Sequence, residues 1–276
     1  MFTVAAKPRA IPEFTNLSAL ADFQSTAHWL ALRGWSEAAG GNMSVRLDVP
    51  AGLSEGPYEA LPLAVPHLAG KALLLTGSGT RAREIGVDPT PHVGLYKISE
   101  DAKHSCWLAG NKKPTMELPT HCAIHNALEQ FRPEDKAILH THPDRLIALC
   151  HVKGMQNSKT ISDKILSLQS EARLILPEGI GFVEHELPGS LTLGLKSAEA
   201  VKLHHLVLWQ FHGCLATGTS LAHAFDLLEV FEKSARVYWQ LHTAGIDPVG
   251  ISKSEIEDIL AAFDCLDRYR SVQPDD

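Results

Sequence analysis

Several features are absent from this chain of 276 residues, and each absence excludes a class of protein. The formal net charge is -7 at pH 7, and an acidic chain does not have the basic surface that nucleic-acid binding requires. No apolar run approaches the length of about 20 residues that a membrane span needs. The N-terminal stretch MFTVAAKPRAIPEF is broken by prolines and has no signal-peptide pattern. We therefore expect a cytoplasmic protein that binds neither nucleic acid nor membrane.

Cysteine is scarce, whereas histidine is abundant. The five cysteines are odd in number, lie far apart and never form a CxxC pair, so we interpret them as reduced thiols. Histidine occurs 15 times, which makes metal binding the first possibility to test. The cysteines are Cys106, Cys122, Cys150, Cys214 and Cys265.

The order of predicted elements indicates one α/β domain over residues 1–276, with residues 1–14 as a loosely ordered N-terminal segment. Apolar periodicity predicts helices over about 16–32, from near Glu117, over 220–245 and over about 252–269. Strands are predicted over 43–47 and in KALLLT, VGLYKIS, SCWLA, AILHTH and ARLILP, with a hairpin-like pair in LVLWQF and GCLATG. Residues 50–70 are predicted to be a loop or a small excursion, and EGIGFVEHELPGS is predicted to be a loop. This mixed order favours helices on both faces of a largely antiparallel sheet.

Two histidines stand one residue apart in KAILHTHPDRLIAL. Because side chains alternate along a strand, His140 and His142 point the same way and Thr141 points the opposite way. Pro143 then ends the strand pairing. A third candidate, His212, lies between two apolar strands in LVLWQFHGCLATG. Three histidine ligands and one open position are typical of a catalytic zinc site, although each histidine alone is equally explained as a hydrogen-bonded or surface residue.

A second set of histidines has metal-ligand spacing as well. His121 and His125 are four residues apart on a predicted helix, and Glu117 lies one turn earlier on the same face. Spacing alone therefore allows a site that combines these two histidines with His140 and His142. Glu117 is explained either as an acidic residue in the first helical turn or, beside a metal, as a general base.

Two glycine turns, GGN at 40–42 and TGSG at 76–79, could bind an anion. Both turns are expected to offer free backbone N–H groups and short polar side chains. Arg81 and Arg83 follow the second turn and could add positive charge. Neither turn matches a Walker A loop or a dinucleotide fingerprint, so the pattern of each, taken alone, favours a plain turn.

Six segments of the chain occur in the order seen in the class II aldolase/adducin family. They are GWSEAAGGNMSVRL, LLLTGSGTRAR, PTMELPTHCAIH, AILHTHPDRLIAL, LILPEGIGF and LVLWQFHGCLATG. The chain resembles this family from about residue 15 to residue 265. The resemblance implies a three-layer α/β/α sandwich and a homotetramer with active sites near subunit interfaces. It also implies one zinc ion per subunit, a sugar-phosphate substrate and the activity of a metal-dependent aldehyde-lyase.

The resemblance also assigns roles to individual residues. The zinc ligands become His140, His142 and His212, and not His121 and His125. Glu117 becomes the catalytic acid/base, and Glu171 in SLQSEARLIL matches a catalytic-site glutamate that reaches a neighbouring subunit. Met116 stands where the family usually has serine, so one phosphate donor is missing. The residues that match the phosphate site are Asn42, Thr76, Gly77, Ser78 and Thr115.

Other activities of the same family remain alternatives. Cleavage of another ketose phosphate such as fuculose phosphate, sugar-phosphate 4-epimerisation and methylthioribulose-phosphate dehydration would use the same metal site. A non-catalytic, adducin-like interaction module is an alternative of a different class. The joint presence of the three histidines and Glu117 favours an enzyme over that module.

Overall fold

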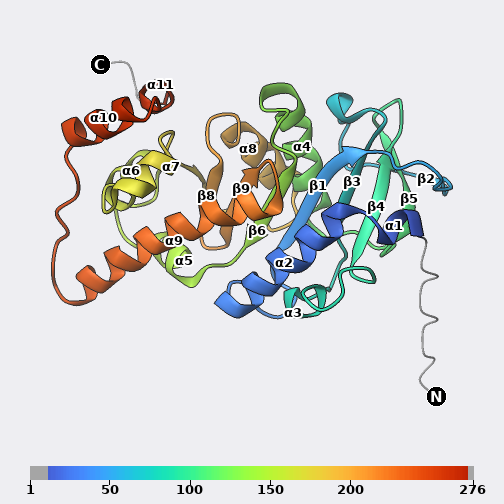
Figure 1. Ribbon diagram of the computed structural model, residues 1–276, viewed down its shortest axis with the longest axis horizontal. Coiled ribbons are helices and arrows are strands. Elements are labelled where there is room, and N and C mark those ends of the chain that lie inside the picture. Colours follow the sequence, from blue (N-terminus) through green and yellow to red (C-terminus); the bar gives the residue numbers. More distant parts are fainter. Residues whose placement is uncertain (1–11, 273–276) are drawn as a thin grey trace.

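The structure, a computed structural model, describes residues 12–272 of the chain and contains one sheet of nine strands within them (Figure 1). The strands are β1 (Asn42–Asp48), β2 (Tyr58–Ala60), β3 (Lys71–Thr76), β4 (Val93–Ile98), β5 (His104–Gly110), β6 (Ala137–Thr141), β7 (Ile180–Val183), β8 (Leu206–Trp209) and β9 (Gly213–Gly218). Their order in the sheet is β2-β5-β4-β3-β1-β6-β9-β8-β7. Every neighbouring pair is antiparallel except β7 and β8, which confirms the prediction of a largely antiparallel sheet.

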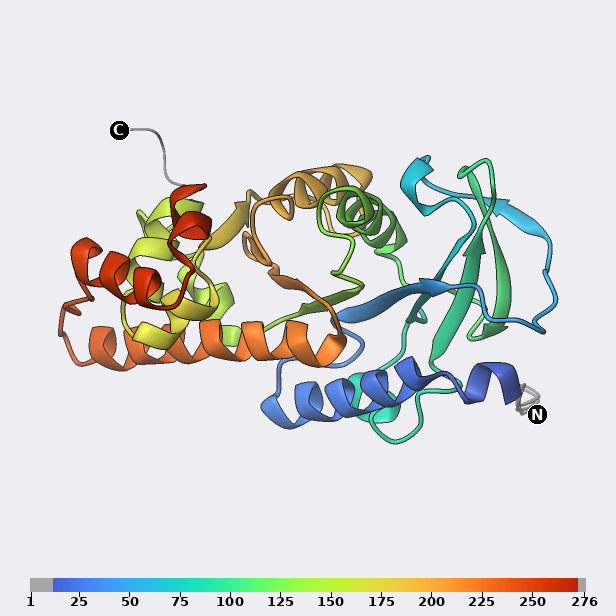
Figure 2. The same ribbon diagram turned by 45° about the horizontal axis from the view of Figure 1, so that its top comes forward.

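Helices cover both faces of the sheet (Figure 2). α2 (Ser18–Arg33) and α9 (Leu221–Thr243) lie on one face, and α4 (Leu118–Phe131) and α8 (Leu191–Ala200) lie on the other. Each layer buries its own apolar cluster against the sheet, which confirms the expected α/β/α arrangement. The remaining helical elements are α1 (Pro12–Thr15), η1 (Pro66–Leu68), α3 (Ala82–Ile85), α5 (Asp144–Leu149), α6 (Ser158–Leu166), α7 (Ser170–Ile175), α10 (Lys253–Ala262) and α11 (Leu266–Arg270).

Strand β1 shows how the alternation of side chains separates the two layers. Met43 belongs to the large apolar cluster beneath α2 and α9. Ser44 and Arg46 of the same strand are buried polar residues whose side chains point to the opposite face. Both contact α4, because Ser44 bonds His121 and Arg46 pairs with Glu129 at 2.7 Å. The α4 face of the sheet therefore has a polar interior at this strand, and this interior lies beside the candidate site.

Two predictions between residues 170 and 183 are wrong. ARLILP was expected to be a strand, but Ser170–Ile175 forms helix α7. The following segment was expected to be a loop, but Ile180–Val183 forms β7 and pairs in parallel with β8. A short apolar run does not distinguish a strand from a buried helical turn. A four-residue strand is also too short to show a pattern of its own.

The chain ends of the described region differ from the prediction in detail. The last helix is two helices, α10 and α11, because Asp264 between them has a left-handed φ of 57°. At the other end, Pro12–Thr15 forms α1 and Phe14 is 2% exposed, whereas residues 1–11 of the predicted loose segment lie outside the described residues. The predicted loop at 50–70 contains the short strand β2 and the turn η1. Within residues 12–272, none of the helices is long and apolar enough to cross a membrane.

Candidate metal centre and acid–base site

The fold brings His140, His142 and His212 together. One ring nitrogen from each lies within 4.8 Å of the others, and among residues 12–272 this is the group of side chains suited to hold a metal ion. His140 lies near the end of β6, and His142 is the residue directly after Thr141, the last residue of that strand. His212 precedes β9, which pairs with β6 so that Thr141 lies opposite Cys214. The pairing of two strands about 70 residues apart in sequence therefore assembles the group.

Hydrogen bonds orient two of the three imidazoles. His140 Nδ1 lies 3.1 Å from the Cys214 carbonyl oxygen, and His142 Nδ1 lies 2.9 Å from Glu37 Oε1. A carbonyl and a carboxylate only accept, so both Nδ1 atoms donate and both Nε2 atoms carry lone pairs. These two Nε2 atoms face each other at 3.1 Å. Two nitrogens that share a zinc ion at about 2.0–2.1 Å are separated by a similar distance, so the arrangement suits a bound cation.

Burial keeps the imidazoles in the form that a metal needs. Burial lowers the pKa of His140 far below its ordinary value, and the nearby His142 and His212 lower it further. Burial also lowers the pKa of His212 to about 4. His140 and His212 are therefore neutral near pH 7 and offer lone pairs instead of charge.

Glycines allow the backbone to approach these rings. A Cβ on Gly213 would lie 2.5 Å from the Thr141 carbonyl oxygen and 2.8 Å from His142 Cδ2. A Cβ on Gly40 would lie 2.8 Å from His142 Nδ1. Real Cβ atoms essentially never make contacts this short, so only glycine fits at both positions without a shift of its neighbours. The glycines in the GGN and FHG motifs thus make room for the histidines.

Glu117 lies beside the histidine group. It occupies the position just before α4, as predicted, and is 7% exposed. Its Oε2 lies 3.6 Å from His140 Nε2, and its Oε1 lies 3.8 Å from His212 Nε2. Burial raises its pKa, and this effect outweighs the opposing hydrogen bond from Asn42 and the charge of His142. The structure therefore combines three imidazoles with one poorly solvated carboxyl group.

His121 and His125 do not join this group. His121 Nδ1 lies 2.7 Å from Ser44 Oγ, and its Nε2 lies 2.5 Å from Asn42 Oδ1. His125 Nε2 lies 2.7 Å from the same Ser44 Oγ. Both rings are buried in the polar interior between α4 and β1. The spacing of four residues that allowed His121 and His125 as metal ligands therefore places both rings against Ser44.

The residues matched to a phosphate site lie along neighbouring segments, but two of the expected donors are already engaged. The Gly77 amide donates to the His92 carbonyl at 2.7 Å, and the Ser78 amide donates to the Lys113 carbonyl at 2.9 Å. The expectation that these amides are free is therefore wrong. The Thr115 hydroxyl accepts a hydrogen bond from the Glu117 amide at 3.3 Å.

The other members of this set also have partners within the chain. The Thr76 hydroxyl accepts from the Met43 amide at 3.2 Å, and the Asn42 amide nitrogen donates to Glu117 at 3.0 Å. Arg81 pairs with Glu84 at 2.8 Å, which offsets its positive charge. The partners of Asn42 and Thr76 lie 75 and 33 residues away in sequence, so the turn motifs alone could not show them.

Two further predicted residues are exposed. Met116 is 74% exposed beside Glu117, and Glu171 is exposed in the first turn of α7. Neither belongs to the histidine group in this chain. Their exposure makes both side chains accessible to a second molecule.

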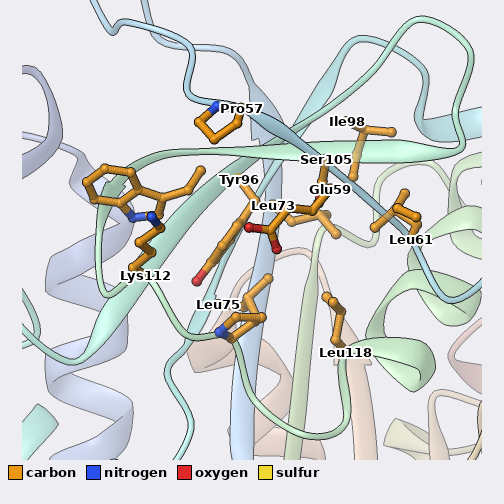
Figure 3. A pocket seen from close by; sticks show the side chains of 13 residues that line it. Pro57, Glu59, Leu61, Leu73, Leu75, Tyr96, Ile98, Ser105, Lys112 and Leu118 are labelled. Atoms are coloured by element: carbon orange, nitrogen blue, oxygen red, sulfur yellow. The ribbon is translucent and has the colours of Figure 1, made fainter.

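A separate cavity of about 80 Å³ lies near the segment that carries Glu117 (Figure 3). Leu73, Leu75 and Tyr96 of the sheet and Leu118 of α4 line it (Figure 3), as does Pro114. The lining is largely apolar and includes neither Glu117 nor the three histidines. This cavity is therefore distinct from the histidine group, although it borders the same segment.

Comparison with known proteins agrees with this geometry. Residues 21–239 match the family described as Class II Aldolase and Adducin N-terminal domain. The rhamnulose-1-phosphate aldolase of Enterobacter sp. (strain 638) is 34% identical over 243 residues, which cover 84% of this chain and 87% of that protein. The enzyme of the same name from Salmonella typhimurium (strain LT2) is 34% identical over 236 residues, which cover 82% and 86%.

Solved structures show the same fold. A sugar-phosphate aldolase from Thermotoga maritima superposes with a TM-score of 0.76 and 37% identity, covering 84% of this chain and 98% of that one. An L-fuculose 1-phosphate aldolase superposes with a TM-score of 0.61, covering 94% of this chain and 100% of that one. Its 18% identity supports the fold alone.

Proposed function

Because the chain belongs to the class II aldolase and adducin family and is a class II aldolase, and hence a lyase, we propose that it acts on L-rhamnulose 1-phosphate. The reaction is reversible cleavage to dihydroxyacetone phosphate and L-lactaldehyde. The name of the curated relatives, which match over more than four fifths of the chain, supports this substrate. We further propose that the enzyme is cytoplasmic and assembles as a homotetramer.

The observation that carries the proposal is the approach of His140 Nε2 and His142 Nε2, which lie 3.1 Å apart beside the buried carboxyl group of Glu117. We propose that His140, His142 and His212 bind one zinc ion per subunit. Bound zinc would supply a Lewis acid for the carbonyl and hydroxyl oxygens of the substrate. The hydrogen bonds from His140 and His142 to Cys214 and Glu37 hold the two rings in the required tautomer.

Glu117 is proposed as the acid/base. In cleavage it returns a proton to the carbon that becomes the hydroxymethyl carbon of dihydroxyacetone phosphate, and in condensation it removes that proton. Its carboxyl oxygens lie 3.6 and 3.8 Å from His140 and His212, so it can reach a carbon held next to the metal position. Its low exposure keeps bulk water away from the proton.

The phosphate group is proposed to bind near Asn42, Thr76, Gly77, Ser78 and Thr115. Since the Gly77 and Ser78 amides are engaged and the buried Thr76 hydroxyl pairs with the Met43 backbone, the half-buried Ser78 hydroxyl is the more accessible donor of this set. Glu171 is proposed to act at the site of a neighbouring subunit, and its exposure on α7 supports that role.

A cleavage assay tests the proposed function. L-Rhamnulose 1-phosphate, L-fuculose 1-phosphate and unphosphorylated L-rhamnulose are supplied to the zinc-loaded protein, and release of dihydroxyacetone phosphate or dihydroxyacetone is measured. We expect the highest kcat/KM for L-rhamnulose 1-phosphate. A higher value for L-fuculose 1-phosphate would reassign the substrate, and no cleavage of any of the three would remove this activity.

A further inference from the structure

A chain of buried hydrogen bonds joins His125 and His121 to Glu117. His125 Nε2 lies 2.7 Å from Ser44 Oγ, and Ser44 Oγ lies 2.7 Å from His121 Nδ1. His121 Nε2 lies 2.5 Å from Asn42 Oδ1, and Asn42 Nδ2 lies 3.0 Å from Glu117 Oε2. Ser44, His121 and His125 are at most 1% exposed. His121 and His125, which do not belong to the proposed metal site, are thus linked by hydrogen bonds to Glu117, the proposed base.

The direction of these hydrogen bonds follows from the chemistry of their ends. An ionised Glu117 only accepts, so the Asn42 amide nitrogen must face it and the amide oxygen must face His121. His121 Nε2 then carries the hydrogen. Burial lowers the pKa of His121 to about 3, so the ring is neutral and its Nδ1 accepts from the Ser44 hydroxyl. Ser44 in turn accepts from His125 Nε2, and every donor in the chain points toward Glu117.

The His125 end of this series of hydrogen bonds agrees with the same direction. If His125 Nε2 donates, its Nδ1 is an acceptor in the neutral ring. Burial lowers the pKa of His125 well below its ordinary value, and the charge of Arg46 lowers it further. His125 Nδ1 is buried and has no hydrogen-bond partner among the described residues. The series of hydrogen bonds therefore begins at His125 and ends at Glu117.

We infer that His121 is a positioning residue for Glu117. It fixes the Asn42 amide with its nitrogen toward the carboxylate. If the amide turned over, its oxygen would face Glu117 and two acceptors would oppose each other. The Nε2–H of His121 prevents this rotation because it pairs only with an oxygen. The inference rests on the proposed role of Glu117 as acid/base.

Three substitutions of His121 separate positioning from packing. His121→Gln keeps an amide that can accept near Nδ1 and donate near Nε2, so it can still hold Asn42. His121→Asn is shorter and can reach Ser44 but not Asn42, and His121→Phe keeps only the ring. His125→Asn is the matched control, because it removes an equally buried imidazole two hydrogen bonds further from Glu117.

We expect His121→Asn and His121→Phe to lower kcat about tenfold to a hundredfold, the range for a misplaced catalytic group. KM and zinc content should change little, and His121→Gln should recover most of the kcat. His125→Asn should lower kcat much less than His121→Asn, although thermal unfolding should show a similar loss of stability. If His121→Phe does not fold, the comparison of the Gln and Asn variants decides the question.

The outcomes distinguish this inference from the proposed function. Glu117→Gln is assayed in parallel, and near-normal turnover in that variant would remove both the base and its positioning residue. If Glu117→Gln is inactive while the His121 variants keep kcat, only the inference fails. Equal kcat losses in His121→Asn and His125→Asn would also overturn it, as would loss of zinc from His121→Gln.

Discussion

The indole of Trp209 packs against the imidazole of His140, with ring centroids 4.3 Å apart and ring planes tilted by 37°. The same indole lies 5.2 Å from the ring of His212. His212 Nδ1 is buried and has no hydrogen-bond partner among the described residues, unlike the corresponding atoms of His140 and His142. Aromatic packing therefore takes the place of a hydrogen bond in orienting His212.

Replacing this indole should loosen the metal site. We expect Trp209→Phe to weaken zinc affinity about tenfold, the lower end of the range for residues that orient metal ligands. Zinc affinity is measured by competition with a chelator. Trp107→Phe is the matched control, because the indole nitrogens of Trp107 and Trp209 are both buried without a partner among residues 12–272 but the Trp107 ring lines the separate cavity. Equal weakening in both variants would argue against a specific role for Trp209.

Removal of single histidines should distinguish the two possible metal sites. His140→Ala should abolish stoichiometric zinc, because it removes one of the three ligand atoms of the group. His121→Ala should retain zinc, because His121 is bonded to Ser44 and Asn42 instead. Elemental analysis of the purified variants measures the zinc content. The opposite pattern would place the metal at the α4 histidines.

A methyl group at Gly213 should disturb the same site through the backbone. Its Cβ would lie 2.5 Å from the Thr141 carbonyl oxygen, which cannot move without displacing β6. We expect Gly213→Ala to destabilise the protein by about 1–3 kcal/mol and to weaken zinc binding. Gly181→Ala serves as the control, because its Cβ would meet only side-chain atoms at 3.1 Å or more. Chemical denaturation measures the loss, and unchanged zinc affinity in Gly213→Ala would contradict the account.

Met116→Ser should improve binding of a phosphorylated substrate. A thioether is only a weak acceptor, whereas a hydroxyl can donate to phosphate. A hydrogen bond to a charged group contributes about 1.5–3 kcal/mol at most here, because Met116 is 74% exposed. We expect a lower KM for L-rhamnulose 1-phosphate and little change for L-rhamnulose. Met116→Ala separates the gain of a hydroxyl from the loss of the thioether, and an equal effect in both variants would exclude the hydroxyl.

Glu178 should make stability depend on acid pH. It is 4% exposed, and its carboxylate lies 2.6 Å from both His205 Nδ1 and Arg268. Burial opposes ionisation, but His205 and Arg268 outweigh it and lower the pKa below 4.5. The stabilisation is therefore complete above the ordinary carboxyl pKa and is lost as pH falls through the lowered folded pKa.

Glu178→Gln should consequently lose about 1–3 kcal/mol of unfolding free energy at pH 7, the range for lost hydrogen bonds to a charged group, because Arg268 is half exposed and keeps its hydration when the carboxylate is removed. The difference from the wild type should begin to shrink below about pH 4.5, where the carboxyl group of the unfolded chain becomes protonated, and should disappear as pH falls through the lowered pKa of the folded state. Denaturant titrations at a series of pH values measure both effects. A constant difference across this range would show that packing and not charge explains the loss.

Local sequence patterns predicted part of the site but not its assembly. Alternation along β6 was enough to place His140 and His142 on one face, and the spacing of α4 was enough to place Glu117 at its start. The approach of His212 depends on the pairing of β6 with β9, which no local pattern contains. The same limit explains why spacing could not separate His121 from the metal ligands: its partner Asn42 lies 79 residues away in sequence.

The carbonyl of Cys214 accepts a hydrogen bond from His140, but its thiol belongs to the apolar cluster on the opposite face of the sheet. Burial raises the pKa of that thiol, so no thiolate competes for the ion. The proposed donors are thus all nitrogen and oxygen, without the sulfur that selects soft cations. Such a donor set discriminates weakly among borderline divalent metals, so the metal carried by the purified protein is expected to follow the supply in the growth medium.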